Sequence, residues 1–149
     1  MKQTIGLCMI LWFFYIFIHS TKSITMSGDL TQSDIQKIES LISDRKKAHA
    51  YYERSSKVYN AFIDMENQAY SVGKLGKKYK EMIAIGISIH INCESCLEWH
   101  IKEALNAGAT KEEIIEAIGV GMEMGGGPAT VSSRFAMKVI EYYTQESNT

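Results

Sequence analysis

Two cysteines three residues apart, Cys93 and Cys96, are the residues of this chain best suited to chemistry. Thiols at positions i and i+3 of a helix lie on one face, where they can close a disulfide with little rearrangement. If a helix begins near Cys93, the dipole and the unpaired N–H groups at its amino end stabilise a thiolate, the reactive form of cysteine. The spacing therefore predicts a redox-active pair.

A base and a carboxylate stand at spacings that complete such a site. His100 follows Cys96 by four residues, on the same helical face and close enough to exchange a proton with its sulfur. Glu81 falls on the preceding expected helix, and antiparallel packing of the two helices would bring its carboxylate beside His100 to orient the imidazole. A base with its own orienting carboxylate is the general arrangement that activates a nucleophile. The predicted catalytic residues are Cys96, Cys93, His100 and Glu81.

The same stretch also offers the ligands of a structural zinc site. The alternative ligand set is His90, Cys93, Cys96 and His100. Structural zinc sites usually draw their ligands from two separated arms, so one short segment would surround the ion only with a sharp break near Asn92. We favour the redox interpretation, which needs neither a metal nor a bound cofactor. In it, His90 is a buried or pocket-lining histidine.

The elements that must position these residues are helices, because apolar residues recur at spacings of three and four along the chain. The pattern predicts one all-α domain of about six helices over residues 30–146. The expected helices are one capped by Ser33 or Asp34, then about 55–69 with Val58, Phe62 and Met65 on one side, 77–91, 93–108, one from the capping box Thr110–Glu113 to 125–127, and one after Pro128.

Several residues that resemble site residues have simpler structural explanations. Met122, Met124 and Met137 are expected to fill the core. Gly119 and Gly121 follow no strand, so they match no phosphate-binding fingerprint and are expected to permit close helix packing.

Composition limits the partners and the compartment. The 149 residues include 16 basic and 17 acidic residues, a formal net charge of −1, and no basic patch stands out for nucleic acid or an anionic membrane. The three cysteines, Cys8 included, are too few for a secreted disulfide scaffold.

The first 25 residues are treated apart from the domain. Residues 5–18 are about fourteen apolar residues, shorter than the roughly 20 that a membrane span needs. They match the apolar part of a signal peptide, with Ser20 or Ser23 at its end, although no Ala-x-Ala cleavage pattern follows. Alternatively, Met26 is the true first residue. A start at Met26 predicts a cytoplasmic protein, and the first reading a secreted or membrane-anchored one.

The spacing Glu81-x11-Cys93-Glu-Ser-Cys96-x3-His100 resembles the signature of the alkylhydroperoxidase D-like proteins, which belong to the carboxymuconolactone decarboxylase superfamily. The stretch 104–118 is similar to the usual continuation of that family, and the resemblance covers about residues 76–142. It implies an all-helical, generally trimeric or hexameric protein.

The resemblance also implies roles. Cys96 would attack a hydroperoxide and become a sulfenic acid, which Cys93 would capture as a disulfide. His100 would accept the proton, with Glu81 completing the relay. A thiol protein or a lipoylated carrier would then restore the dithiol.

One position departs from the family pattern. The best-known peroxidase of the family has a histidine immediately before the second cysteine, where this chain has Ser95, which cannot act as a base. A weaker peroxidase is therefore expected. The alternatives are a non-enzymatic redox sensor or binding module, and an enzyme like the decarboxylases, which generally lack the cysteine pair.

Overall fold

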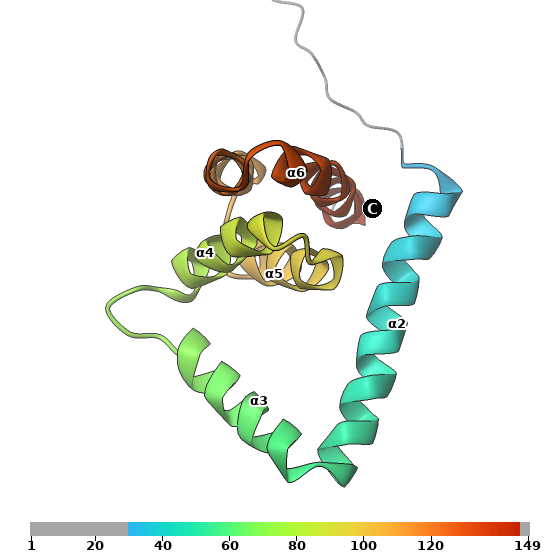
Figure 1. Cartoon of the computed structure of the whole chain (residues 1–149), viewed down its shortest axis with the longest axis vertical. Coiled ribbons are helices and arrows are strands. Elements are labelled where there is room, and N and C mark those ends of the chain that lie inside the picture. Colours follow the sequence, from blue (N-terminus) through green and yellow to red (C-terminus); the bar gives the residue numbers. More distant parts are fainter. Residues whose placement is uncertain (1–29, 147–149) are drawn as a thin grey trace, which may run out of the picture.

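The structure is a computed structural model that describes residues 30–146 (Figure 1). Its helices are α2 (Gln32–Ser55), α3 (Lys57–Tyr70), α4 (Lys77–His90), α5 (Glu94–Asn106) and α6 (Lys111–Glu146). A kink at Gly126, with φ 62° and ψ −151°, divides α6 into two helices. Within residues 30–146 the fold is therefore six helical segments without a strand, and the all-α prediction is confirmed. The predicted apolar segment 1–25 lies outside the described residues.

Helices α4 and α5 form an antiparallel pair at the centre of the domain. Lys77 near the start of α4 pairs with Glu103 near the end of α5, and Glu81, one turn later, contacts His100. Residue numbers therefore increase in opposite directions along the two helices, which are antiparallel. This is the arrangement that the spacing of Glu81 and His100 predicted.

The first half of α6 runs parallel to α4. Lys78 pairs with Glu113 near the start of both helices, and Gly125 lies against His90 near their ends. After the kink the second half of α6 returns along the first, because Lys111 forms an ion pair with Glu141. The kink confirms the predicted interruption at 125–127. The predicted capping box is also confirmed, because Thr110 and Glu113 exchange hydrogen bonds at the start of α6.

A glycine allows α4 and α6 to approach closely. A Cβ at Gly121 would lie 2.6 Å from the carbonyl oxygen of Gly86 and 2.9 Å from the Cβ of Ile89. The predicted packing role is confirmed for Gly121. It is wrong for Gly119, where a Cβ would meet nothing within 4 Å, because that residue faces away from the helix contact.

The hydrophobic core lies between α4, α5 and both halves of α6, with one contribution from α2. Its fully buried large residues are Ile38, Ile85, Ile89, Leu97, Ile101, Ile114 and Val139. Met122 packs against this cluster as predicted. The prediction is wrong for Met124 and Met137, which are 70% and 38% exposed because their helical positions point away from the core.

The long helix α2 begins at a different cap from the one predicted. Thr31 is the N-cap, its hydroxyl accepts from the Asp34 N–H, and the Asp34 carboxylate accepts from the Thr31 N–H. Ser33 is therefore not the cap, and Asp34 serves as the third residue of a capping box. Ile38 is the buried residue of α2, and an ion pair between Asp34 and Lys138 joins its first turn to α6.

Helices α2 and α3 form the two arms of a V that opens toward the packed helices α4 to α6, with the joint between the arms away from them (Figure 1). No residue of α3 is buried. The apolar side predicted for this helix is exposed, at 82% for Val58, 52% for Phe62 and 59% for Met65. The contribution of α3 is therefore to line a cavity rather than to fill the core.

Candidate active site

The turn between α4 and α5 places the cysteine pair. Asn92 adopts a left-handed conformation, with φ 55°, which asparagine tolerates better than most residues. Its side-chain Oδ1 accepts a hydrogen bond of 2.5 Å from the Ser132 hydroxyl of α6, and the next N–H, that of Cys93, donates to the carbonyl of Ser88 at 3.0 Å. These bonds hold the start of α5 against both neighbouring helices.

Cys93 is the N-cap residue of α5 and forms a disulfide with Cys96. Their Cα atoms are 5.2 Å apart, and the Cys96 N–H donates to the Cys93 sulfur at 3.3 Å. The predicted helix start near Cys93 is confirmed. One sulfur therefore takes the position where a side chain normally satisfies the free N–H groups of a helix.

One turn further along α5, His100 contacts Glu81 as the sequence predicted. The imidazole Nδ1 donates to the Glu81 Oε2 at 2.8 Å. With the hydrogen on Nδ1, Nε2 is the nitrogen that can accept a proton. Glu81 is only 2% exposed, and this burial raises the pKa of its carboxyl group, while the hydrogen bond from His100 opposes the rise.

Glu81, Cys96 and His100 line one cavity of about 570 Å³, to which α2, α3, α4 and α5 all contribute. Ser95, the position that departs from the family pattern, also lines it, whereas Cys93 is not among its lining residues. Most other walls are aromatic or basic. They include Arg45, His49, Tyr59, Phe62, Tyr70 and Trp99. A nucleophile at Cys96 would therefore meet its substrate in a largely apolar, partly enclosed space.

Tyr70, at the end of α3, is a site residue that sequence reasoning missed. Its ring stacks on the His100 imidazole, with the ring centroids 5.4 Å apart and the planes 27° from parallel. Burial raises the pKa of the Tyr70 hydroxyl, and the nearby carboxylates of Glu81 and Glu66 add to the rise. The tyrosine is thirty residues from the histidine in the chain, and no short-range spacing signal connects them.

A buried hydrogen-bond network next to the cavity was also not predicted from the sequence. Glu98, on the turn after Cys96, is fully buried and hydrogen-bonded by Arg45 of α2 and Tyr143 of α6. The Arg45 guanidinium also lies 4.8 Å from the ring centroid of Trp99, which lines the cavity. Burial, together with the Glu98 hydrogen bond, raises the pKa of Tyr143. This network joins α2 to the helix that carries the cysteines.

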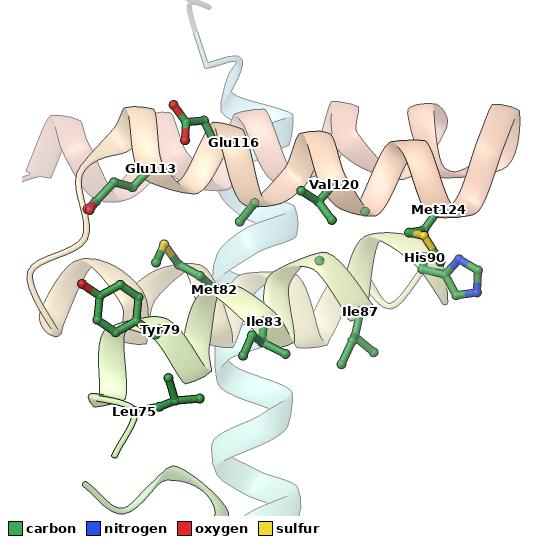
Figure 2. Close-up of a pocket in the computed structure, with 13 residues that line it drawn as sticks. Leu75, Tyr79, Met82, Ile83, Ile87, His90, Glu113, Glu116, Val120 and Met124 are labelled. Atoms are coloured by element: carbon green, nitrogen blue, oxygen red, sulfur yellow. The ribbon is translucent and has the colours of Figure 1, made fainter. Parts of the chain in front are cut away.

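The four residues of the alternative zinc set do not surround one point. His90 lines a separate groove beside Met124, where it is exposed (Figure 2). His100 faces the cysteine cavity and is hydrogen-bonded to Glu81. Within residues 30–146 no three His, Cys, Asp or Glu side chains are gathered as metal ligands. The expectation that His90 lines a pocket is confirmed, and the alternative that it is buried is wrong.

Comparisons with known proteins find relatives of this chain by sequence and by fold. The sequence profile of the carboxymuconolactone decarboxylase family matches residues 56–138. An uncharacterised protein of the cox locus of Paracoccus denitrificans is 35% identical over 82 residues, which are 55% of this chain and 74% of that protein. An uncharacterised protein of Cupriavidus necator is 32% identical over 84 residues, which are 56% of this chain and 72% of that protein.

Two solved structures share the fold. A carboxymuconolactone decarboxylase family protein from Legionella pneumophila, in its apo form, is 27% identical, with a TM-score of 0.68 over 72% of this chain and 96% of that one. A protein of the same family from Thermotoga maritima, for which a role in the antioxidative response has been suggested, is 24% identical. Its TM-score is 0.69 over 73% of this chain and 93% of that one. No helix within residues 30–146 has the length and apolar character to cross a membrane.

Proposed function

Because the chain belongs to the carboxymuconolactone decarboxylase family, we propose that it is a thiol peroxidase and disulfide oxidoreductase. In this proposal it reduces hydroperoxides through a sulfenic acid at Cys96 and a disulfide between Cys93 and Cys96. The substrate is a hydroperoxide, and the reductant is a thiol protein or a lipoylated protein. The enzyme acts without a bound cofactor.

The observation that carries the proposal is the placement of the cysteine disulfide beside an oriented base. Cys96 and His100 line the same cavity, and the hydrogen bond from His100 to the buried Glu81 fixes which imidazole nitrogen can accept a proton. A disulfide that only stabilised the fold would gain nothing from this pairing. A base oriented by a carboxylate is what a nucleophilic thiol requires.

The first step of the proposed cycle oxidises Cys96. His100 takes the thiol proton, and the Cys96 thiolate attacks the outer oxygen of the hydroperoxide. An S–O bond forms as the O–O bond breaks, and the leaving alkoxide takes a proton to become an alcohol. Sulfur has then lost two electrons and stands as a sulfenic acid. The start of α5 favours a thiolate at its N-cap, because the Cys96 N–H donates to the sulfur of Cys93, the thiol that acts in the second step.

The second step forms the disulfide and the third restores the dithiol. The Cys93 thiolate attacks the Cys96 sulfenic acid, and the departing hydroxide takes a proton to leave as water. One thiol of a reduced dithiol then attacks the disulfide between Cys93 and Cys96, which forms a mixed disulfide and releases one cysteine as a thiol. The second thiol of the dithiol attacks the mixed disulfide and closes the dithiol's own disulfide. Two electrons and two protons have then returned to the cysteines. Cys96 lines the cavity and Cys93 does not, which favours Cys96 as the sulfur that meets the peroxide.

The proposal is tested by peroxide consumption with dithiothreitol or dihydrolipoamide as reductant. Sustained consumption is expected from the wild-type chain and from the matched control Cys8→Ser, and none from Cys96→Ser. In Cys93→Ser, a sulfenic acid should accumulate at Cys96 and react with a sulfenic-acid trap. If Cys96→Ser consumed peroxide at the wild-type rate, the assignment would be wrong.

A further inference from the structure

One charged residue of the cysteine cavity has no role in the cycle described above. Arg45 of α2 lines this cavity together with Cys96 and His100, and its side chain is 25% exposed. The first step of the cycle places negative charge on two atoms in turn, the Cys96 sulfur and the oxygen that leaves the peroxide. A fixed positive charge beside these atoms stabilises both.

Two contacts fix the guanidinium group of Arg45. Its Nη1 donates to a carboxylate oxygen of Glu98, whose side chain is fully buried. The other oxygen of that carboxylate accepts from the Tyr143 hydroxyl, so the Glu98 side chain is itself held in place. The guanidinium also lies over Trp99, 4.8 Å from its ring centroid. A guanidinium held by a buried carboxylate and an aromatic ring is positioned before a substrate enters.

The contact with Trp99 places this charge next to the reactive sulfur. Cys96, Trp99 and His100 stand at positions i, i+3 and i+4 of α5, and all three line the cavity. Residues three or four apart on a helix are neighbours, with about 5–6 Å between their Cβ atoms. Because Arg45 covers the ring of Trp99, its guanidinium lies on the same face of α5 as Cys96.

The pairing with Glu98 leaves the positive end of the ion pair on the cavity side. Arg45 lines the cavity, and Glu98 is not among its lining residues. An arginine carries five N–H donors, and the bond to Glu98 uses one of them. Donors therefore remain for a group inside the cavity. In a partly enclosed space their effect on a negative atom is larger than in open water.

The two lysines of the cavity are less suited to this role. Lys77 forms an ion pair with Glu103 near the end of α5, whereas Cys96 lies near its start. Lys46 is exposed, so its charge is screened by solvent and its side chain keeps its freedom. Arg45 is therefore the cation that the described residues hold in a fixed position on the Cys96 face.

We propose that Arg45 is a further catalytic residue, which stabilises the Cys96 thiolate and the oxygen that leaves the hydroperoxide. This inference rests on the proposed function, because it concerns the first step of that cycle. As the S–O bond forms and the O–O bond breaks, the negative charge passes from sulfur to the leaving oxygen. That oxygen takes a proton and departs as the alcohol. Arg45 donates hydrogen bonds to it and keeps its own protons, because a guanidinium stays charged.

The effect on the thiolate is tested without peroxide. The parent is the reduced full chain with Cys8→Ser and Cys93→Ser, in which iodoacetamide alkylates Cys96 in proportion to its thiolate. Arg45→Met should slow alkylation at about pH 7 by about tenfold, and the rates should converge near about pH 10, where the thiol is ionised in both proteins. The matched control Lys47→Met removes an exposed cation of α2 outside the cavity, and it should leave the rate within about twofold.

A second pair of variants keeps the test valid if Arg45→Met unfolds, because that change leaves the buried Glu98 without its cation. The variant Arg45→Met with Glu98→Gln removes both charges, and glutamine still accepts from the Tyr143 hydroxyl. Circular dichroism shows that it is folded. It should alkylate as slowly as Arg45→Met, whereas Glu98→Gln alone should alkylate at least as fast as the parent, because it retains the cation.

The effect on the leaving oxygen is tested with cumene hydroperoxide in a single turnover of the same chains near about pH 10, where the thiolate is complete with or without Arg45. The rate of sulfenic acid formation should still be about tenfold lower without Arg45.

The inference and the proposed function fail separately. Equal alkylation rates at about pH 7 in the parent and in the folded variant without Arg45 would overturn the role of Arg45, whether or not peroxide is consumed. If the wild-type chain consumes no peroxide while alkylation still depends on Arg45, the proposed function is wrong and Arg45 remains the group that stabilises the Cys96 thiolate.

Discussion

Tyr70 and His100 are stacked although they belong to α3 and α5, whose backbones do not pack against each other. The imidazole is thus held on two sides, by the Glu81 carboxylate in its plane and by the phenol ring across its face. An aromatic ring that lies over an imidazole restricts its rotation. The stack therefore determines, together with Glu81, where the free Nε2 points.

The stacking predicts a difference between two substitutions at Tyr70. Tyr70→Phe keeps the ring and should retain kcat/KM for peroxide reduction within about twofold, whereas Tyr70→Ala removes it and should lower kcat/KM on the order of tenfold. The pH dependence of the rate is measured alongside. The Ala variant should show a displaced profile, because His100 loses part of its surroundings, and Tyr70→Phe should not. Equal rates and profiles in all three proteins would contradict a positioning role.

Glu81→Gln should lower activity while it raises stability at neutral pH. Burial raises the pKa of Glu81 in the folded protein, so the stability that this group contributes is complete below its unfolded pKa and is lost as the pH rises through the folded value. The loss begins above the ordinary value of 4.5. Glutamine carries no charge and shows no such loss. The peroxidase rate should fall on the order of tenfold, because the amide cannot stabilise a protonated His100.

The measurement is urea unfolding of both proteins between pH 4 and pH 7. The free energy of unfolding of Glu81→Gln, relative to the wild type, should increase across this range. A constant difference would show that the Glu81 carboxyl group titrates alike in the folded and unfolded chains.

Two alanine substitutions in the same helix should change stability in opposite directions. Gly121→Ala places a Cβ against the backbone of Gly86 and should lower the free energy of unfolding by about 1–3 kcal/mol. Gly119→Ala meets nothing within 4 Å and should raise it by about 0.5–1 kcal/mol, because glycine is costly inside a helix. Chemical denaturation measures both. A stabilised Gly121→Ala would show that α4 and α6 pack less closely than described.

Within the network of Arg45, Glu98 and Tyr143, removal of the buried Glu98 carboxylate should cause the largest loss in the free energy of unfolding. Glu98→Ala leaves the Arg45 charge without its partner and opens a space in the core, and it should lower the free energy of unfolding by about 3 kcal/mol. Tyr143→Phe removes a single hydrogen bond to the same carboxylate and should lower it by about 1 kcal/mol. Similar losses in the two variants would indicate that Glu98 is not the centre of the network.

The parts of the fold that short-range patterns control could be predicted from the sequence. The bounds of α4, the cap of α6 by Thr110 and Glu113, and the break near Gly126 all depend on residues within one or two helical turns. The contact of Glu81 with His100 was also accessible, because α4 and α5 are joined by a three-residue turn that leaves few ways to pack them.

The contacts that cross longer stretches of chain could not be predicted. Tyr70 reaches His100, and Arg45 reaches Glu98, only because the tertiary fold brings the end of α3 and part of α2 within side-chain reach of α5. The sequence spacing of Tyr70 to His100, or of Arg45 to Glu98, does not distinguish Tyr70 from the other tyrosines or Arg45 from the other arginines of the chain. The same holds for the apolar side of α3. The spacing of its apolar residues predicts a helix, but it does not predict which neighbouring helix, if any, packs against that side.

The absence of buried residues in α3 has a consequence for how this protein can change. Tyr59, Ile63 and Asn67 line the cysteine cavity yet contribute nothing to the core. Mutations at these positions can alter which molecules reach Cys96 without endangering the fold, whereas the helices that carry the cysteines and Glu81 are fixed by packing. Under the proposed function, selection for new substrates can therefore act on one wall of the cavity while the cysteine chemistry stays the same, and this division makes the domain readily adaptable.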